Sequence, residues 1–352
     1  MKKLLTTLFA IVLAISSTLL FACTPATTSE SLESSASSES QESVETPANL
    51  TFYAPDGAPA LSISKFIKDN ENFGMNANIS YSVVSASNIG PTMMQGKGDF
   101  IVMPVNAASK LYKANASDPY VMTAVVTHGN LYIVSNEELT LEGLKGKVIG
   151  VIGRGLVPDL TFKAILKDNG LLDSVVEGST PTDGKITIRY FAEAPEMLPL
   201  LKQGMLTVGL LPEPAATKLT TKLASDKTWF RLDVQELYDS ETKAYPQAVL
   251  MVKKSIYDKY KANIDQMAAA FADNLTWIKA NTAEAITAIN GVLPEGAVPS
   301  LDATSITSTV IDNCKIYYQS AVDAKQEVKD YINKIIAVDN SSAKAITDDF
   351  FA

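Results

Sequence analysis

The sequence predicts an α/β protein of two similar lobes, each with a mixed, mostly parallel sheet flanked by helices, followed by a mainly helical C-terminal region. Three observations support this fold class. Short apolar strands alternate with amphipathic helices, which is typical of layered α/β domains with largely parallel sheets. Residues spread over 95–111 recur 108 positions later, so the two halves look like copies of one lobe. The 352 residues are enough for roughly two domains of ordinary size.

The leader, residues 1–22, is expected to be a signal peptide outside the fold. Lys2 and Lys3 form a positive start, and an apolar run interrupted by hydroxyl residues ends in Leu20-Phe21-Ala22-Cys23. This ending resembles the lipobox of bacterial lipoproteins, which implies cleavage before Cys23 and diacylation of its sulfur. The alternative is an uncleaved membrane anchor, which would need about 20 apolar residues with less hydroxyl content. Both interpretations place the rest of the chain on the extracytoplasmic face of the cell membrane.

Residues 23–47 are predicted to be a disordered tether between the lipid and the folded domain. The segment is rich in Ser, Thr and Glu and contains no Lys or Arg. With so few apolar side chains, it cannot offset the conformational entropy that ordering would cost.

The first lobe is expected to begin at residue 48 and to run to residue 129. Each of its three units is a strand followed by a loop and a helix. They are Leu50–Tyr53 into Pro59–Asp69, Ile79–Val84 into Ile89–Met94, and Phe100–Met103 into Val105–Lys113. Two strands, Val121–Val126 and Leu131–Val134, are separated by His128-Gly129-Asn130, which we interpret as a first crossing between the lobes.

The second lobe is expected over residues 130–245, and residues 246–352 are expected to complete the first lobe. Three more units build the second lobe: Lys147–Ile152 into Pro158–Asn169, Ile186–Phe191 into Pro195–Gln203, and Thr207–Leu211 into Ala215–Leu223. The apolar run Ala248–Val252 predicts a strand that follows a second crossing, and two crossings make a hinge. After Lys253 we expect helices, including Asp258–Asn281 and one long helix Ser305–Ile336, packed on the first lobe.

Composition excludes several classes of function. A formal charge of −9 argues against binding a nucleic-acid backbone, which needs a concentrated basic surface. The single histidine, His128, excludes a zinc site built from several imidazoles and leaves few parts for catalysis. Gly153-Arg154-Gly155 follows an apolar strand, but Pro158 stands where a dinucleotide motif needs a third Gly or Ala. We therefore expect no metal, no cofactor and no enzymatic activity. Cys314, within an apolar helical pattern, is predicted to be a small core residue.

Five motifs carry a resemblance to a known family. They are Ala54-Pro55-Asp56-Gly57-Ala58-Pro59-Ala60, Met103-Pro104-Val105-Asn106-Ala107-Ala108, Gly129-Asn130-Leu131-Tyr132-Ile133-Val134, Leu144-Lys145-Gly146-Lys147 and Leu211-Pro212-Glu213-Pro214. The pattern resembles the substrate-binding lipoproteins of ABC transporters, in the nitrate, sulfonate, taurine and thiamine-pyrimidine (NMT1/SsuA-like) branch of the type II periplasmic binding protein fold. The resemblance implies a protein that captures a small solute between two lobes and delivers it to a membrane permease.

The expected ligand-binding residues lie in loops at the carboxyl ends of the strands and in the hinge. Such loops meet at one edge of a sheet, beside helix N-termini whose N–H groups are unpaired. The candidates are Asp56, Gly57, Ala58, Ser85, Ser87, Asn88, Val105, Asn106, Asn130, Gly153, Arg154, Gly155, Leu156, Glu193, Glu213 and Tyr245. Each also has a structural interpretation: the serines as helix caps, the glycines as turn residues, Arg154 on the solvated rim, and Glu213 as a link between the lobes.

Two alternatives stay open at this stage. The first is a ligand-sensing lipoprotein with the same fold, which differs only in its partner. The second is a pyrimidine-biosynthesis enzyme of the same branch, although such enzymes depend on a histidine and a cysteine-rich motif that this chain lacks. We expect a monomer that binds a sulfonate, a zwitterion or a heterocycle. The last two are favoured because Arg154 is the only arginine in the candidate loops.

Overall fold

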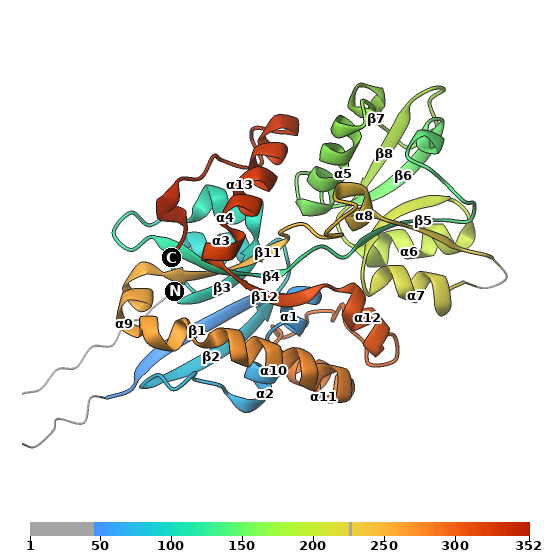
Figure 1. Cartoon of the computed structure of the whole chain (residues 1–352). Coiled ribbons are helices and arrows are strands. Elements are labelled where there is room, and N and C mark those ends of the chain that lie inside the picture. The colour runs from blue at the N-terminus through green and yellow to red at the C-terminus, as the bar shows by residue number, and fades with distance from the viewer. Residues whose placement is uncertain (1–45, 225–226) are drawn as a thin grey trace, which may run out of the picture. The chain divides into compact units, whose positions relative to one another are not determined.

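Two six-stranded mixed sheets organise the protein (Figure 1). The computed structural model describes residues 46–224 and 227–352. The predicted signal peptide, Cys23 and all but the last two residues of the predicted tether lie outside the described residues. Within the described part of the chain, no helix is long and apolar enough to cross a membrane.

The first sheet has the strand order β12-β4-β11-β3-β1-β2. Its strands are β1 (Ala48–Pro55), β2 (Ala77–Val84), β3 (Phe100–Pro104), β4 (Tyr120–Thr127), β11 (Ala248–Lys253) and β12 (Ile316–Ser320). Strand β1 pairs in parallel with β2 and β3, whereas β11 runs antiparallel to both β3 and β4. Strands β3, β4 and β11 are buried along almost their whole length, because helices cover both faces of the sheet.

Helices on the two faces of the first sheet form two separate hydrophobic clusters. One face carries α1 (Ala58–Leu61), α2 (Ser64–Asp69), α10 (Met267–Ala280) and α11 (Thr282–Gly291), and the other carries α3 (Ile89–Met94) and α4 (Val105–Leu111). Helix α9 (Lys254–Ile264) follows β11 directly. The buried Asn274 amide joins α10 to the α1–α2 turn, because it donates to the carbonyls of Leu61 and Ser62 and accepts from the Lys65 N–H.

The second sheet has the order β10-β5-β9-β6-β8-β7. Its strands are β5 (Leu131–Ser135), β6 (Lys147–Ile152), β7 (Val175–Glu177), β8 (Ile186–Phe191), β9 (Val208–Pro212) and β10 (Phe230–Asp233). Its helices are α5 (Val157–Asp168), α6 (Ala194–Gln203), α7 (Ala215–Thr221) and α8 (Val234–Tyr238). Three short 3₁₀ helices complete the described part of the chain: η1 (Glu142–Leu144), η2 (Leu172–Ser174) and η3 (Asp348–Phe350).

The internal repeat predicted from the sequence is confirmed by the strand orders. In the first sheet the repeat strands stand in the order β2-β1-β3, and in the second their equivalents stand in the order β8-β6-β9. Each third repeat strand is flanked by an antiparallel strand that follows a crossing: β11 beside β3 and β5 beside β9. The chain changes sheet between Thr127 and Leu131 and again between Asp233 and Ala248. The lobe boundaries at residues 129 and 245 themselves stay a prediction.

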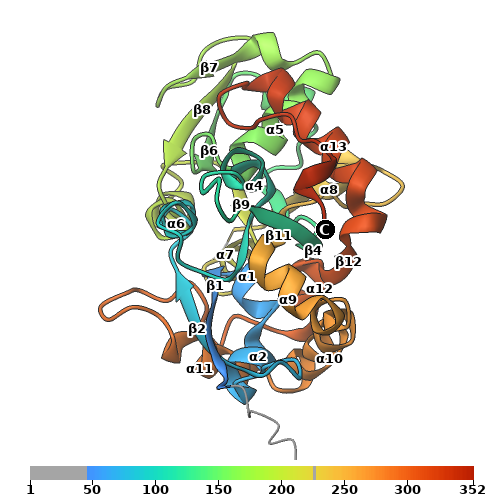
Figure 2. The ribbon, with the colours of Figure 1, turned by 90° about the vertical axis from the view of Figure 1, so that its left-hand side faces the viewer.

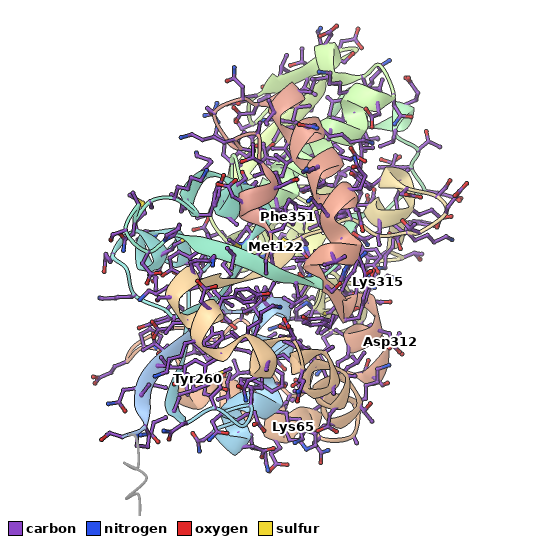
Figure 3. All side chains as sticks on the ribbon, turned by 60° about the vertical axis from the view of Figure 1, so that its left-hand side comes forward. Lys65, Met122, Tyr260, Asp312, Lys315 and Phe351 are labelled. Atoms are coloured by element: carbon purple, nitrogen blue, oxygen red, sulfur yellow. The ribbon has the colours of Figure 1, made fainter. Side chains whose placement is uncertain are left out.

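The single long helix expected over Ser305–Ile336 is wrong. The segment forms α12 (Ser308–Asn313), the edge strand β12 and then α13 (Ala321–Val338). Lys315 has a φ of 49°, which ends α12, and the side chains of Thr307 and Ser320 cap the N-termini of the two helices. Figure 3 labels Asp312 and Lys315 at this break. Cys314 is fully buried, as predicted.

Helix α13 packs on the first lobe, as expected, and it also contacts α5 of the second lobe (Figure 2). The Tyr331 hydroxyl lies 2.6 Å from the Thr161 hydroxyl on α5, and Lys334 Nζ lies 2.7 Å from a carboxylate oxygen of Asp168. After α13 the chain returns to the first sheet, where Phe351 pairs with Met122 (Figure 3). Helix α13 therefore braces one side of the hinge.

Candidate solute-binding site

A chain of hydrogen-bonded amides runs through the hinge where the two sheets meet. Asn130, in the first crossing, donates its Nδ2 to the carbonyl oxygen of Glu213 at 3.2 Å. Gln247, in the second crossing, donates its Nε2 to Asn130 Oδ1 at 2.9 Å, and its own carbonyl accepts from the Val105 N–H at 3.1 Å. Next to Val105, the Asn106 amide donates its Nδ2 to the Ser342 carbonyl oxygen at 3.1 Å.

The orientation of these amides follows from the two backbone carbonyl groups at the ends of the hydrogen-bonded series. A carbonyl oxygen only accepts hydrogen bonds, so the nitrogen of Asn106 must face Ser342 and the nitrogen of Asn130 must face Glu213. Asn130 Oδ1 is then the acceptor for Gln247. Two buried acceptors, Asn106 Oδ1 and Gln247 Oε1, are left without a hydrogen-bond partner among the described residues.

Tyr245 closes the same region from the second crossing. Its ring is fully buried and stacks on the ring of Tyr331, with centroids 5.6 Å apart. Gly129, at a φ of 88°, lets the ring approach, because a Cβ atom there would lie 2.6 Å from Tyr245 Cε1. The hydroxyl makes no hydrogen bond of good geometry to a described residue. Burial raises the pKa of this phenol well above its usual value, although Thr161 and Asn130 nearby oppose the shift, so the group keeps its proton.

Glu213 is a buried anchor between the lobes. Its carboxylate accepts from the Thr217 N–H at 3.0 Å and from the Thr217 hydroxyl at 2.8 Å, and it pairs with Arg231. It also accepts from Asn313 Nδ2 at 3.1 Å, a residue of α12 on the first lobe. A second ion pair, between Lys218 and Asp302, joins the same parts of the chain at 3.2 Å. The contacts favour the structural interpretation of Glu213 over a free ligand-binding carboxylate.

Solved structures are similar over most of the chain. An ABC transporter protein from Parabacteroides distasonis shares 19% sequence identity, with a TM-score of 0.68 over 88% of this chain and 99% of its own. The periplasmic aliphatic sulphonate binding protein SsuA from Escherichia coli shares 13%, with a TM-score of 0.60 over 86% and 96% of the two chains. The alkanesulfonate-binding protein SsuA from Xanthomonas axonopodis pv. citri, bound to MOPS, shares 15%, with a TM-score of 0.56 over 86% and 100%.

The chain has the periplasmic binding protein fold. No family model matches the sequence, and no curated protein is similar enough to match it. The fold expected from the sequence motifs is therefore confirmed at the level of the two lobes and their sheets.

Within this periplasmic binding fold, the first-lobe candidates divide into buried and exposed residues. Ala58, Val105 and Asn106 are buried, whereas Ser87 and Asn88 are exposed and Ser85 is half-buried. Ser85 and Ser87 bond to each other through their hydroxyls at 3.0 Å, and Asn88 caps α3 without a side-chain hydrogen bond.

Asp56 and Gly57 form a tight turn that binds a later loop of the same lobe. Asp56 accepts from the Gly57 N–H and from the Ser300 N–H, both at 2.8 Å, so each carboxylate oxygen has a partner. Gly57 has a φ of 103°, a backbone conformation that favours glycine. The turn therefore uses both residues structurally.

On the second lobe, the candidates after β6 and β8 are more exposed. Gly153 and Gly155 have φ values of 69° and 72°, and Leu156 and Glu193 are exposed. The Arg154 side chain is 67% exposed, and its guanidinium pairs with Glu177 of β7 at 2.6 Å. Arg154 thus lies on the solvated rim, which is the second of its two interpretations.

One contact brings the loops of the two lobes together. The C-terminal segment passes between them: Ser342 accepts from Asn106 through its carbonyl oxygen, and its hydroxyl faces Gly155. A Cβ atom at Gly155 would lie 3.3 Å from that hydroxyl. Ser342 thus lies between Asn106 and Gly155, Asn130 bonds directly to Glu213, and Val105 and Gln247 link the two pairs.

Two parts of the site were not predicted from the sequence: Gln247 and the C-terminal segment around Ser342. Gln247 precedes its strand, whereas most candidates were taken from loops that come after strands, and Ser342 lies about a hundred residues beyond the second lobe. Gln247 stands next to Tyr245 and Pro246 in the second crossing, and this position is the signal that could have identified it.

The described residues form no metal cluster, and two hollows on the second lobe lie away from the predicted ligand-binding residues. Among the described residues, no cluster of three or more His, Cys, Asp or Glu side chains is arranged to hold a metal ion. A hollow of about 440 Å³ lies between α6 and α7 on the second lobe, lined by Pro195, Leu198, Lys218 and Leu223, among others. A smaller one of about 140 Å³ lies beside β5 and β10. Neither is lined by a residue predicted to bind ligand.

Proposed function

We propose that this protein is an extracytoplasmic solute-binding lipoprotein, anchored through Cys23, that captures a small organic solute between its lobes and delivers it to an ABC import permease. The fold supports this role, since proteins similar to it include an ABC transporter component and two sulfonate-binding proteins. The Xanthomonas protein is bound to MOPS, a small organic molecule.

One observation carries the proposal: two amide oxygens and a hydroxyl are buried at the hinge without hydrogen-bond partners among the described residues. They are Asn106 Oδ1, Gln247 Oε1 and the Tyr245 hydroxyl, and Thr127 Oγ1 and His128 Nδ1 at the start of the first crossing are unpaired as well. Leaving one such group unpaired costs about 1–3 kcal/mol, so native proteins satisfy nearly all of them. Three together, at the junction of the two lobes, are what a site completed by its ligand requires.

The first test of solute binding is native mass spectrometry of the full-length protein purified from cells, followed by thermal-shift screening. The panel contains sulfonates, amino acids, pyrimidines and flavins. A ligand that binds only the folded state raises the melting temperature as its concentration exceeds Kd. We expect a retained small molecule or a concentration-dependent shift. If no molecule is retained and no compound of the panel shifts the melting temperature, solute binding is contradicted.

The lipid anchor is tested separately with the substitution Cys23→Ser. We expect the unsubstituted protein to fractionate with membranes and to carry a diacylated N-terminal cysteine, and the variant to lose both properties. The matched control is Cys314→Ser, because Cys314 is a buried free thiol in the first lobe and does not belong to the lipobox-like motif. Equal membrane association of all three proteins would contradict lipidation at Cys23.

A further inference from the structure

We infer that the solute is a neutral or cationic hydrogen-bond donor, such as an amide, an amidine or a heterocycle with N–H groups, and not an oxyanion. This inference rests on the proposed solute-binding function and names the class of its solute. Two independent features support it: first-turn carboxylates that already accept from the loops before their helices, and amide oxygens that can only accept.

Each of the two longest helices of the second lobe carries an acidic side chain in its first turn that accepts from a loop N–H two residues before the helix. At α5, Asp159 Oδ2 accepts from the Gly155 N–H at 2.8 Å. At α6, Glu196 Oε2 accepts from the Ala192 N–H at 3.1 Å. In both helices an acidic side chain in the first turn reaches back to the loop that follows the strand. A helix N-terminus normally attracts an anionic ligand, but here the protein supplies the anion itself.

The remaining charges on these loops oppose an anionic solute. Asp56, Glu193 and Glu196 form no ion pair among the residues that the structure describes. The one arginine of the loops, Arg154, is paired with Glu177 and directed to solvent. An incoming sulfonate or carboxylate would therefore meet unneutralised carboxylates and no available guanidinium, and like charges repel.

The amide oxygens at the hinge set the complementary requirement. Asn106 is only 4% exposed, and its nitrogen is committed to the Ser342 carbonyl, so the buried Oδ1 can only accept. Gln247 Oε1 is fixed in the same way, because its nitrogen donates to Asn130. A partner for these two atoms must bring N–H or O–H groups, which an ionised sulfonate or carboxylate group does not have.

The test compares four probes that share one ring and differ only in the attached group: benzamidine, benzamide, benzoate and benzenesulfonate. Binding to the full-length protein is measured by calorimetry and thermal shift, and any molecule retained from cells is identified by mass spectrometry. We expect benzamidine or benzamide to bind at least tenfold more tightly than either oxyanion. The substitution Asn106→Ala should weaken the binding of that probe at least fivefold, whereas the exposed Asn78→Ala on β2 should not.

The outcomes separate this inference from the proposed function. Tighter binding of benzoate or benzenesulfonate, or a retained solute that is an oxyanion without donor groups, overturns the donor inference while solute binding stands. If none of the four probes binds, the retained molecule decides: a neutral or cationic donor supports the inference. No binding by any of the four probes, no retained molecule and no thermal shift across the wider panel of the first test would together overturn the proposed function, and the inference with it.

Discussion

Removing the charge of Glu213 should loosen the junction between the lobes. In Glu213→Gln, one carboxylate oxygen becomes an NH₂ group. In the unsubstituted protein, both carboxylate oxygens of Glu213 face donors of Thr217, Arg231 and Asn313, so the new NH₂ group would face donors whichever oxygen it replaces. Arg231 also loses its partner. Breaking a buried ion pair from one side costs about 3–5 kcal/mol, and because Arg231 is partly exposed we expect the lower end, about 3 kcal/mol. For a domain of this size, that loss lowers Tm by roughly 6 °C.

Urea unfolding followed by circular dichroism measures this loss, with Glu177→Gln as the matched control. Glu177 makes the same type of pair, with Arg154, but both side chains are largely exposed. Exposed pairs contribute little, so the control should lie within about 0.5 kcal/mol of the unsubstituted protein. Equal unfolding midpoints for Glu213→Gln and Glu177→Gln would refute the reasoning that burial and the four contacts make Glu213 a structural link.

Three further perturbations test the hinge. Tyr245→Phe should weaken solute binding, measured by calorimetry, about fivefold with little change in unfolding free energy. Its control, Tyr331→Phe, removes a hydroxyl bonded to Thr161 and should cost about 1 kcal/mol of stability without changing the affinity. The reverse pattern would exclude Tyr245 from the site. Burial lowers the pKa of His128 to about 4, so the unfolded state binds its proton first as the pH falls below about 6.5, and stability is lost between these values. Between pH 7 and pH 5, the unfolding free energy measured with urea should fall by about 2 kcal/mol more in the unsubstituted protein than in His128→Gln. An equal fall in the two proteins would contradict this. Gly129→Ala should destabilise by at least about 2 kcal/mol in the same assay, because its Cβ would overlap the Tyr245 ring, and a neutral effect would show that the ring can move.

The candidate site was predictable in part. Asn106, Asn130 and Tyr245 were identified because they follow a strand or stand in a crossing, positions that the pattern of apolar runs locates. Arg154 and Glu193 were chosen by the same rule, yet the structure leaves both exposed. Position in a loop predicts which residues lie near the lobe junction, but a side chain's direction depends on partners such as Glu177 that the loop's own sequence does not contain.

The sequence by itself predicted the strand-loop-helix units of the two lobes and their internal repeat, because these depend on local periodicity and on motifs within a few residues. It also predicted the fold, since two copies of one strand-loop-helix set joined by two crossings allow few other arrangements. Only the tertiary structure decided which hydrogen-bonding groups are left for a solute. The contacts that decide it join Asn130 to Glu213 across 83 residues and to Gln247 across 117. Such pairings form only when the lobes pack. No local pattern therefore reveals whether the Glu213 carboxylate is free or whether an amide oxygen is left unpaired.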